Sequence, residues 1–146
     1  MQLEIAQNTD CSDIDFAKLE SWLTQEFEKA IEGTLSLALV DNAAITEVNE
    51  QFLQHEGPTD VISFLLAEEG APNPENQFGE LVISVEMARQ EARARGLPIQ
   101  EETFRYCVHG ILHLLGYDDQ TDKGADEMMQ QQERIVARHC HGHPNH

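Results

Sequence analysis

The sequence predicts an α+β fold, in which helices pack against one mixed sheet of about four strands. Its 146 residues correspond to one domain at roughly 150 residues per domain, and no repeat or linker divides residues 1–146. The composition, 40% hydrophobic and 25% charged, is that of an ordinary soluble globular protein. Strand-like apolar runs and segments of helical periodicity both occur along the chain, so one small α+β domain is the economical assembly.

Four segments have the composition of strands. Met1–Gln7 alternates weakly, as an edge strand does, and Thr34–Val40 (TLSLALV) is β-rich and apolar. Thr59–Leu66 (TDVISFLL) has the apolar character of a central strand. Leu81–Val85 follows a loop of Gly, Pro and Asn over Glu69–Phe78, and we expect it to pair with the strand before it.

Five segments are predicted helical. Ser12 or Asp13 is expected to cap the first helix, which runs to about Ile31 and ends before Gly33. Its apolar residues recur at helical spacing: Phe16, Leu19, Leu23, Phe27 and Ile31. A short helix is predicted over Asn42–Leu53, followed later by helices over about 86–95, 101–115 and 123–138.

The composition also bears on location. No apolar run approaches the roughly 18–20 residues of a membrane span, and residues 1–10 lack the order of a signal peptide. Three cysteines, Cys11, Cys107 and Cys140, have no disulfide-framework spacing. We therefore expect a cytoplasmic protein with no membrane partner.

The charge is acidic and unevenly distributed. Nine Lys and Arg against 27 Asp and Glu give a net charge of −18, unlike a protein that grips nucleic acid through phosphates. Residues 1–80 carry −15 and residues 81–146 carry −3. The stretch Arg89–Arg105 holds four arginines and three glutamates, so any polyanion is expected there; the alternative is a solvated helix face.

The segment that indicates chemistry is His109-Gly-Ile-Leu-His113-Leu-Leu-Gly116-Tyr-Asp118-Asp119. Histidines four residues apart lie on one side of a helix, where both imidazoles can bind one metal ion. Gly116 is placed to end the helix, and the turn after it brings Asp118 and Asp119 near the histidines. Two His and one Asp with an open fourth position suit a catalytic zinc site.

A helical wheel places the two histidines away from the core. The predicted core stripe consists of Phe104, Val108, Ile111, Leu112 and Leu115. His109 and His113 fall on the side shared with Glu102, Arg105 and Tyr106, where they could line a groove. The alternative is a pair of surface histidines before an acidic turn.

The spacing H-x-x-x-H-x-x-G-x-x-D also gives the site a zincin-like arrangement. Zinc metalloproteases need Glu directly after the first His as general base, and Gly110 stands there, which disfavours peptide hydrolysis. The polar, His-rich tail 139–146 (HCHGHPNH) is expected to fray; metal binding by it is the less favoured interpretation.

Together these motifs resemble the YbeY family of bacterial endoribonucleases and rRNA maturation factors. The family signature H-G-x-L-H-L-x-G-Y-D-H is matched by His109, Gly110, Leu112, His113, Leu114, Gly116, Tyr117 and Asp118. Upstream matches are Asn49, Pro58, Thr59, Asp60, Val61, Ser63 and Phe64, and the strand Gly79-Glu80-Leu-Val-Ile-Ser84. The resemblance spans about residues 36 to 133.

The resemblance implies a small α+β domain with one divalent ion, zinc first, held by His109, His113 and Asp119. It implies cleavage of single-stranded RNA, maturation of the small-subunit rRNA 3′ end and ribosome quality control. Asp119 stands where the family has His, and an anionic ligand lowers the positive charge of the site. Leu53 stands where the family has arginine, and Arg105, one turn before His109, is predicted to take over the phosphate contact.

Two functions follow from these features. The first is a metal-dependent endoribonuclease acting on rRNA, for which neither Glu102 nor Asp118 is a firm general base, so the catalytic residues stay unknown. The second is a catalytically weak or inactive ribosome-assembly factor, favoured by Leu53, Asp119 and the charge of −18. In both, an acidic surface suits docking on basic proteins of the small ribosomal subunit.

Overall fold

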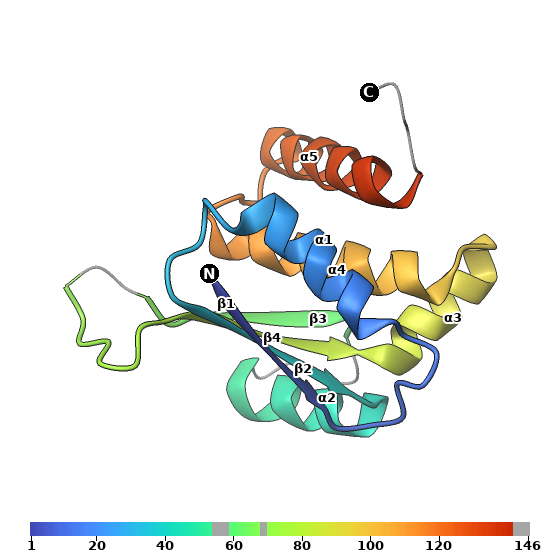
Figure 1. Ribbon diagram of the computed structural model, residues 1–146, viewed down its shortest axis with the longest axis horizontal. Coiled ribbons are helices and arrows are strands. Elements are labelled where there is room, and N and C mark those ends of the chain that lie inside the picture. Colours follow the sequence, from blue (N-terminus) through green and yellow to red (C-terminus); the bar gives the residue numbers. More distant parts are fainter. Residues whose placement is uncertain (54–58, 68–69, 142–146) are drawn as a thin grey trace.

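A four-stranded mixed sheet divides the protein into two unequal sides (Figure 1). The computed structural model describes residues 1–53, 59–67 and 70–141. The strands are β1 (Gln2–Gln7), β2 (Thr34–Val40), β3 (Val61–Leu65) and β4 (Gln77–Ser84), in the order β1-β2-β4-β3. The helices are α1 (Phe16–Phe27), α2 (Asn42–Val48), α3 (Val85–Arg95), α4 (Ile99–Leu114) and α5 (Asp122–Cys140), and a π-helical turn, η1 (Asn49–Leu53), extends α2.

The sheet is mixed, as predicted. β1 pairs with β2 and β2 with β4 in parallel, with Leu37 opposite Leu81. β3 lies antiparallel to β4, with Ile62 opposite Val82, which confirms the expected pairing of these two strands. β4 begins at Gln77, four residues before the predicted start, because its first residues extend the ladder to β2.

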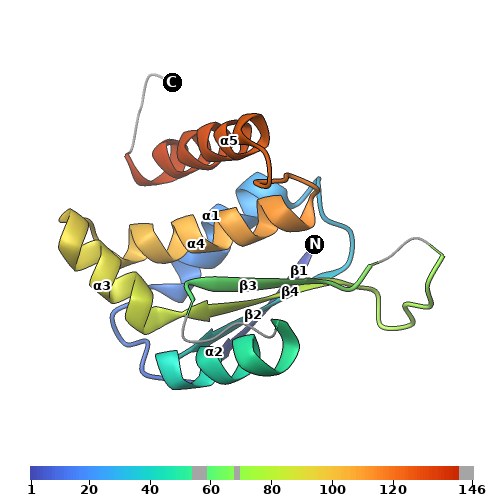
Figure 2. The same ribbon diagram turned by 180° about the vertical axis from the view of Figure 1, so that it is seen from behind.

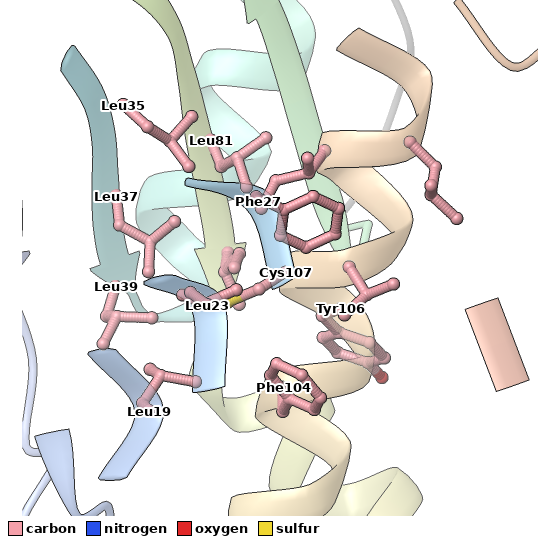
Figure 3. Packing of buried hydrophobic residues seen from close by; sticks show 14 of the residues in the cluster. Leu19, Leu23, Phe27, Leu35, Leu37, Leu39, Leu81, Phe104, Tyr106 and Cys107 are labelled. Atoms are coloured by element: carbon pink, nitrogen blue, oxygen red, sulfur yellow. The ribbon is translucent and has the colours of Figure 1, made fainter. Parts of the chain in front are cut away.

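Side chains alternate between the two faces of the sheet. The larger core joins one face to α1 and α4, and Figure 3 shows Leu35, Leu37 and Leu39 of β2 and Leu81 of β4 directed toward those helices. The smaller core lies on the other face, where Ile45 of α2 packs with Val40, Ile62 and Val82. This period of two is the physical basis of the apolar strand pattern in the sequence.

The first helix is shorter than predicted at both ends. Its cap is Asp15, whose side chain accepts a hydrogen bond from the Lys18 amide, and it ends at Phe27. Asp13 does not cap it, because its carboxylate accepts two hydrogen bonds from the Arg89 guanidinium at 2.8 and 2.9 Å. The ion pair between Asp13 and Arg89 thus uses the carboxylate that the sequence pattern predicted as the helix cap.

α4 is enclosed on almost every side. It lies between the sheet and α5, with α1 next to it over the same face of the sheet, as Figures 1 and 2 show from opposite directions. Four residues of the predicted core stripe, Phe104, Val108, Ile111 and Leu112, are buried, and Leu115 is half-buried. Residues on the opposite side of the helix are buried as well: Glu101, Glu102, Arg105 and Tyr106. This burial places charged side chains between α4 and α5, next to the two histidines.

Candidate metal centre

His109 and His113 lie on the last two turns of α4, with their ring centroids 4.8 Å apart and their planes at 83°. Both side chains are partly exposed, unlike most of the helix. Gly110, between them, is buried where α4 meets the sheet: a Cβ there would lie 2.7 Å from Cδ2 of Leu81 and 3.1 Å from Oγ of Ser63. The position that would hold the metalloprotease glutamate therefore faces the core and has no room for a side chain.

The end of α4 turns the chain back as predicted. Gly116 has a φ of 103°, and the Tyr117 amide donates to the carbonyl of Leu112 at 3.0 Å, a left-handed helix end that favours glycine. Asp118 then accepts a hydrogen bond from the Gln120 amide at 2.8 Å. The carboxylate of Asp118 thus shapes the turn.

The start of α5 fixes the other end of this loop. Thr121 caps α5 by accepting from the Gly124 amide at 3.0 Å. Gly124 lies against the loop so closely that a Cβ would lie 2.1 Å from the Asp118 carbonyl oxygen. The loop is therefore held at both ends, which places Asp119 beside the histidines.

The three predicted ligands come together. One ligand atom from each of His109, His113 and Asp119 lies within 4.8 Å of the others. Nε2 of His113 is 3.5 Å from Oδ2 of Asp119, close to the spacing of roughly 3.3–3.5 Å between ligands of a tetrahedral ion with bonds of about 2.0–2.2 Å. The donor set of two imidazoles and one half-exposed carboxylate fits zinc and leaves a fourth position open.

His109 also has the partner that a metal-binding histidine usually has. Its Nδ1 lies 2.8 Å from Oε1 of Gln132 on α5, and Gln132 is buried. A carbonyl oxygen only accepts hydrogen bonds, so in a neutral imidazole this contact favours a proton on Nδ1 and a lone pair on Nε2. Sequence analysis missed Gln132, since its proximity to His109 arises only when α5 packs on α4.

Arg105 lies nearby but not as predicted. Its side chain is 7% exposed, and its guanidinium donates to Glu101 at 3.0 Å, Glu102 at 2.9 Å and Glu133 at 2.9 and 3.0 Å. Burial alone would lower the pKa of Arg105, but these hydrogen bonds outweigh it and raise the pKa. Arg105 borders the cleft beside His109, but its guanidinium is bound by three carboxylates, so this geometry does not support the predicted phosphate contact.

Glu102 and Leu53 complete the sequence-predicted positions. Glu102 is fully buried and pairs with both Arg95 and Arg105, which leaves it no access to a reacting group. The side chain of Leu53 lies outside the described residues, as do residues 142–146 of the tail. The prediction that the tail frays from residue 139 is wrong for its first residues, because α5 extends to Cys140 and the His139 side chain is 8% exposed, 2.8 Å from Glu26.

A cleft of about 380 Å³ adjoins His109, between α3, α4 and α5. Its lining residues include Asp60, Arg95, Tyr106 and Gln132. His109 lines it as predicted, whereas His113, expected in the same groove, is not among the described lining residues. Burial, followed by the charges of Asp60 and Glu102, raises the pKa of Tyr106 and keeps the phenol protonated. The cleft therefore offers one exposed cation, Arg95, next to a cluster of carboxylates.

Comparison with known proteins places these residues in a family. A family model described as Endoribonuclease YbeY matches residues 4–139. An endoribonuclease YbeY of Moorella thermoacetica is 42% identical over 113 residues, 73% of this chain and 72% of the relative. The endoribonuclease YbeY of Bifidobacterium animalis subsp. lactis is 32% identical over 143 residues, 93% of this chain and 78% of the relative.

The fold agrees with a solved structure as well. The solution structure of TM1509 from Thermotoga maritima superimposes with a TM-score of 0.67 at 30% identity, over 93% of this chain and 87% of that one. The family match includes α4, the loop that holds Asp119 and most of α5. The histidine pair, the loop and the α+β scaffold that carries them thus occur together in a chain that belongs to the endoribonuclease YbeY family.

Proposed function

We propose that this protein is a metal-dependent endoribonuclease that cleaves single-stranded RNA, with zinc held by His109, His113 and Asp119. The observation that carries the proposal is the convergence of these three ligand atoms within 4.8 Å, next to a cleft that His109 lines. Relatives at 32 and 42% identity bear the name endoribonuclease, and the comparisons do not favour an inactive binding factor.

Each of the three proposed ligands has a separate role at the metal site. A divalent ion at this position supplies Lewis acidity toward a phosphate oxygen or acidifies a bound water. His109 and His113 present ring nitrogens from one rigid helix, and Asp119 contributes an anionic oxygen from the loop. The anionic ligand lowers the net charge of the site relative to three histidines, so we expect a weaker pull on the substrate phosphate than a three-histidine site exerts.

We assign the phosphate contact to Arg95, in place of Arg105. Within the arginine stretch, Arg89 is paired with Asp13. Arg95 and Arg105 both line the cleft, but the side chain of Arg95 is 43% exposed and that of Arg105 only 7%. Only Nη1 of Arg95 contacts Glu102, and its Nε and Nη2 have no partner among the described residues. Those donors are available to bind a phosphate.

We further propose a cytoplasmic role in maturation of the small-subunit rRNA 3′ end and in ribosome quality control. The net charge of −18 repels free RNA, so basic proteins of the small ribosomal subunit are the expected docking partners. No helix in the described part of the chain is long and apolar enough to cross a bilayer.

The decisive test is metal content by elemental analysis, with residues 142–146 removed from every sample so that the last two tail histidines do not contribute and α5 stays whole. We expect about one zinc per wild-type chain, lost in Asp119→Ala, and cleavage of single-stranded RNA that His113→Ala abolishes. Arg95→Ala should weaken RNA binding and cleavage while zinc content stays unchanged, and Arg93→Ala, on the same helix turn, is the matched control. A wild-type protein that takes up no zinc when supplied with it would refute the hydrolase.

A further inference from the structure

We infer that Gln132 is a positioning residue, which holds His109 as its Nδ1–H tautomer through an orientation imposed by Glu133 and Arg105. The inference rests on the proposed metal site, and it deepens that proposal by naming the residues that prepare a ligand before any ion arrives. Gln132 and Glu133 belong to α5, whereas none of the three proposed metal ligands does.

The amide of Gln132 can donate from one end and accept at the other, so its orientation decides the proton on His109. Its Nε2 donates to Oε2 of Glu133 at 3.0 Å, and its Oε1 lies 2.8 Å from Nδ1 of His109. A carboxylate only accepts, so the reversed amide would set oxygen against oxygen at Glu133. The carboxylate therefore selects one amide orientation, and that orientation selects the Nδ1–H tautomer.

Glu133 is itself fixed by Arg105. The guanidinium binds it with two parallel hydrogen bonds of 2.9 and 3.0 Å, a geometry that sets the carboxylate plane. Burial alone would raise the pKa of Glu133, but the hydrogen bonds from Arg105 and Gln132 lower it, so the carboxylate stays ionised.

Arg105 is in turn held from α4, its own helix. Glu101 and Glu102, one turn before it, accept from Nη2 and Nη1 at 3.0 and 2.9 Å and leave little freedom for rotation. The hydrogen-bonded chain from α4 to α5 and back thus ends on the ring of His109, on the same helix. Its members are 0 to 7% exposed except for Glu133, at 41%.

The consequence is that the neutral His109 ring presents the lone pair of Nε2 to a metal without a change of tautomer or a rotation of the ring. A free neutral imidazole divides between two tautomers, and metal binding through Nε2 requires the one that the Gln132 carbonyl selects. Packing of α5 therefore supports the metal site at two points. Gly124 in its first turn fixes the loop of Asp119, and Gln132 in its middle orients His109.

The test reads the tautomer directly in the metal-free full chain, by nitrogen-15 chemical shifts of the histidine ring at a pH of about 8, above the ordinary imidazole pKa of about 6.5. We expect wild-type His109 to carry its proton on Nδ1. In Gln132→Leu we expect a mixture of tautomers and a loss of zinc affinity of about 10–100-fold, measured against a competing chelator. Gln130→Leu, exposed on the same helix, is the matched control and should leave both the tautomer and the zinc affinity unchanged.

Each outcome decides the inference. Wild-type His109 protonated on Nε2 would overturn it whether or not any variant folds. Equal zinc affinity in Gln132→Leu and wild type would overturn it as well, while the proposed zinc site would stand. A wild-type protein that binds no zinc would refute the proposed function instead, and the tautomer of the metal-free protein would still decide the role of Gln132.

Discussion

Replacing Arg105 by methionine tests whether Arg105 stabilises the fold or binds the substrate phosphate. The substitution removes four hydrogen bonds and leaves three carboxylates, two of them almost fully buried. Removal of one partner from a buried ion pair typically costs about 3–5 kcal/mol, because the remaining charge stays desolvated. Glu102 keeps Arg95 and Glu133 is 41% exposed, so we expect the lower end, about 3 kcal/mol.

The loss should depend on pH with a definite sign. In wild type the pKa of Glu133 is held below its ordinary value, so the stability from this contact is present above that ordinary pKa and is lost in acid. In Arg105→Met, Glu133 loses the hydrogen bonds from Arg105 that lower its pKa, so its partial burial favours the neutral form and destabilises the fold increasingly as pH rises. The difference between the two proteins should therefore be largest near neutrality and shrink toward about pH 5.

The assay is urea unfolding followed by circular dichroism at about pH 7.5 and about pH 5, with Arg93→Met as the exposed control. A deficit of about 3 kcal/mol corresponds to a fall in Tm of roughly 10 °C for a chain of this size. The reasoning would be refuted by an Arg105→Met protein as stable as wild type that has lost RNA binding, since that result assigns Arg105 to the substrate.

Two glycines beside the ligands yield the remaining predictions. Gly110→Ala sets a Cβ 2.7 Å from the Leu81 side chain, and overpacking of about 1–3 kcal/mol should outweigh a helix-propensity gain of up to about 1 kcal/mol. Thermal unfolding should show the net loss, and a more stable variant would contradict the close packing. Gly124→Ala sets a Cβ 2.1 Å from the Asp118 carbonyl, which must move the loop of Asp119 and lower zinc affinity about tenfold or more. Unchanged zinc affinity would show that the loop does not depend on this contact.

The sequence by itself determined the types of the elements and the grouping of His109, His113 and Asp119. Periods of two and of about 3.6 residues report which face of a strand or helix is apolar, and that local information identified the strands and the helices. The triad was predictable for the same reason, since His109 and His113 share one helix side and Gly116 ends the helix close to Asp119.

Only the tertiary structure decided what covers the polar side of α4. A helical wheel placed Arg105 beside the histidines but carried no information on α5, which buries that side and surrounds the guanidinium with carboxylates. Gln132 lies 23 residues from His109 in sequence, and no local pattern joins them. Asp13 shows the same limit, because its ion pair with Arg89 spans 76 residues. Contacts between distant polar side chains depend on how helices pack, and periodicity records only that a face is buried.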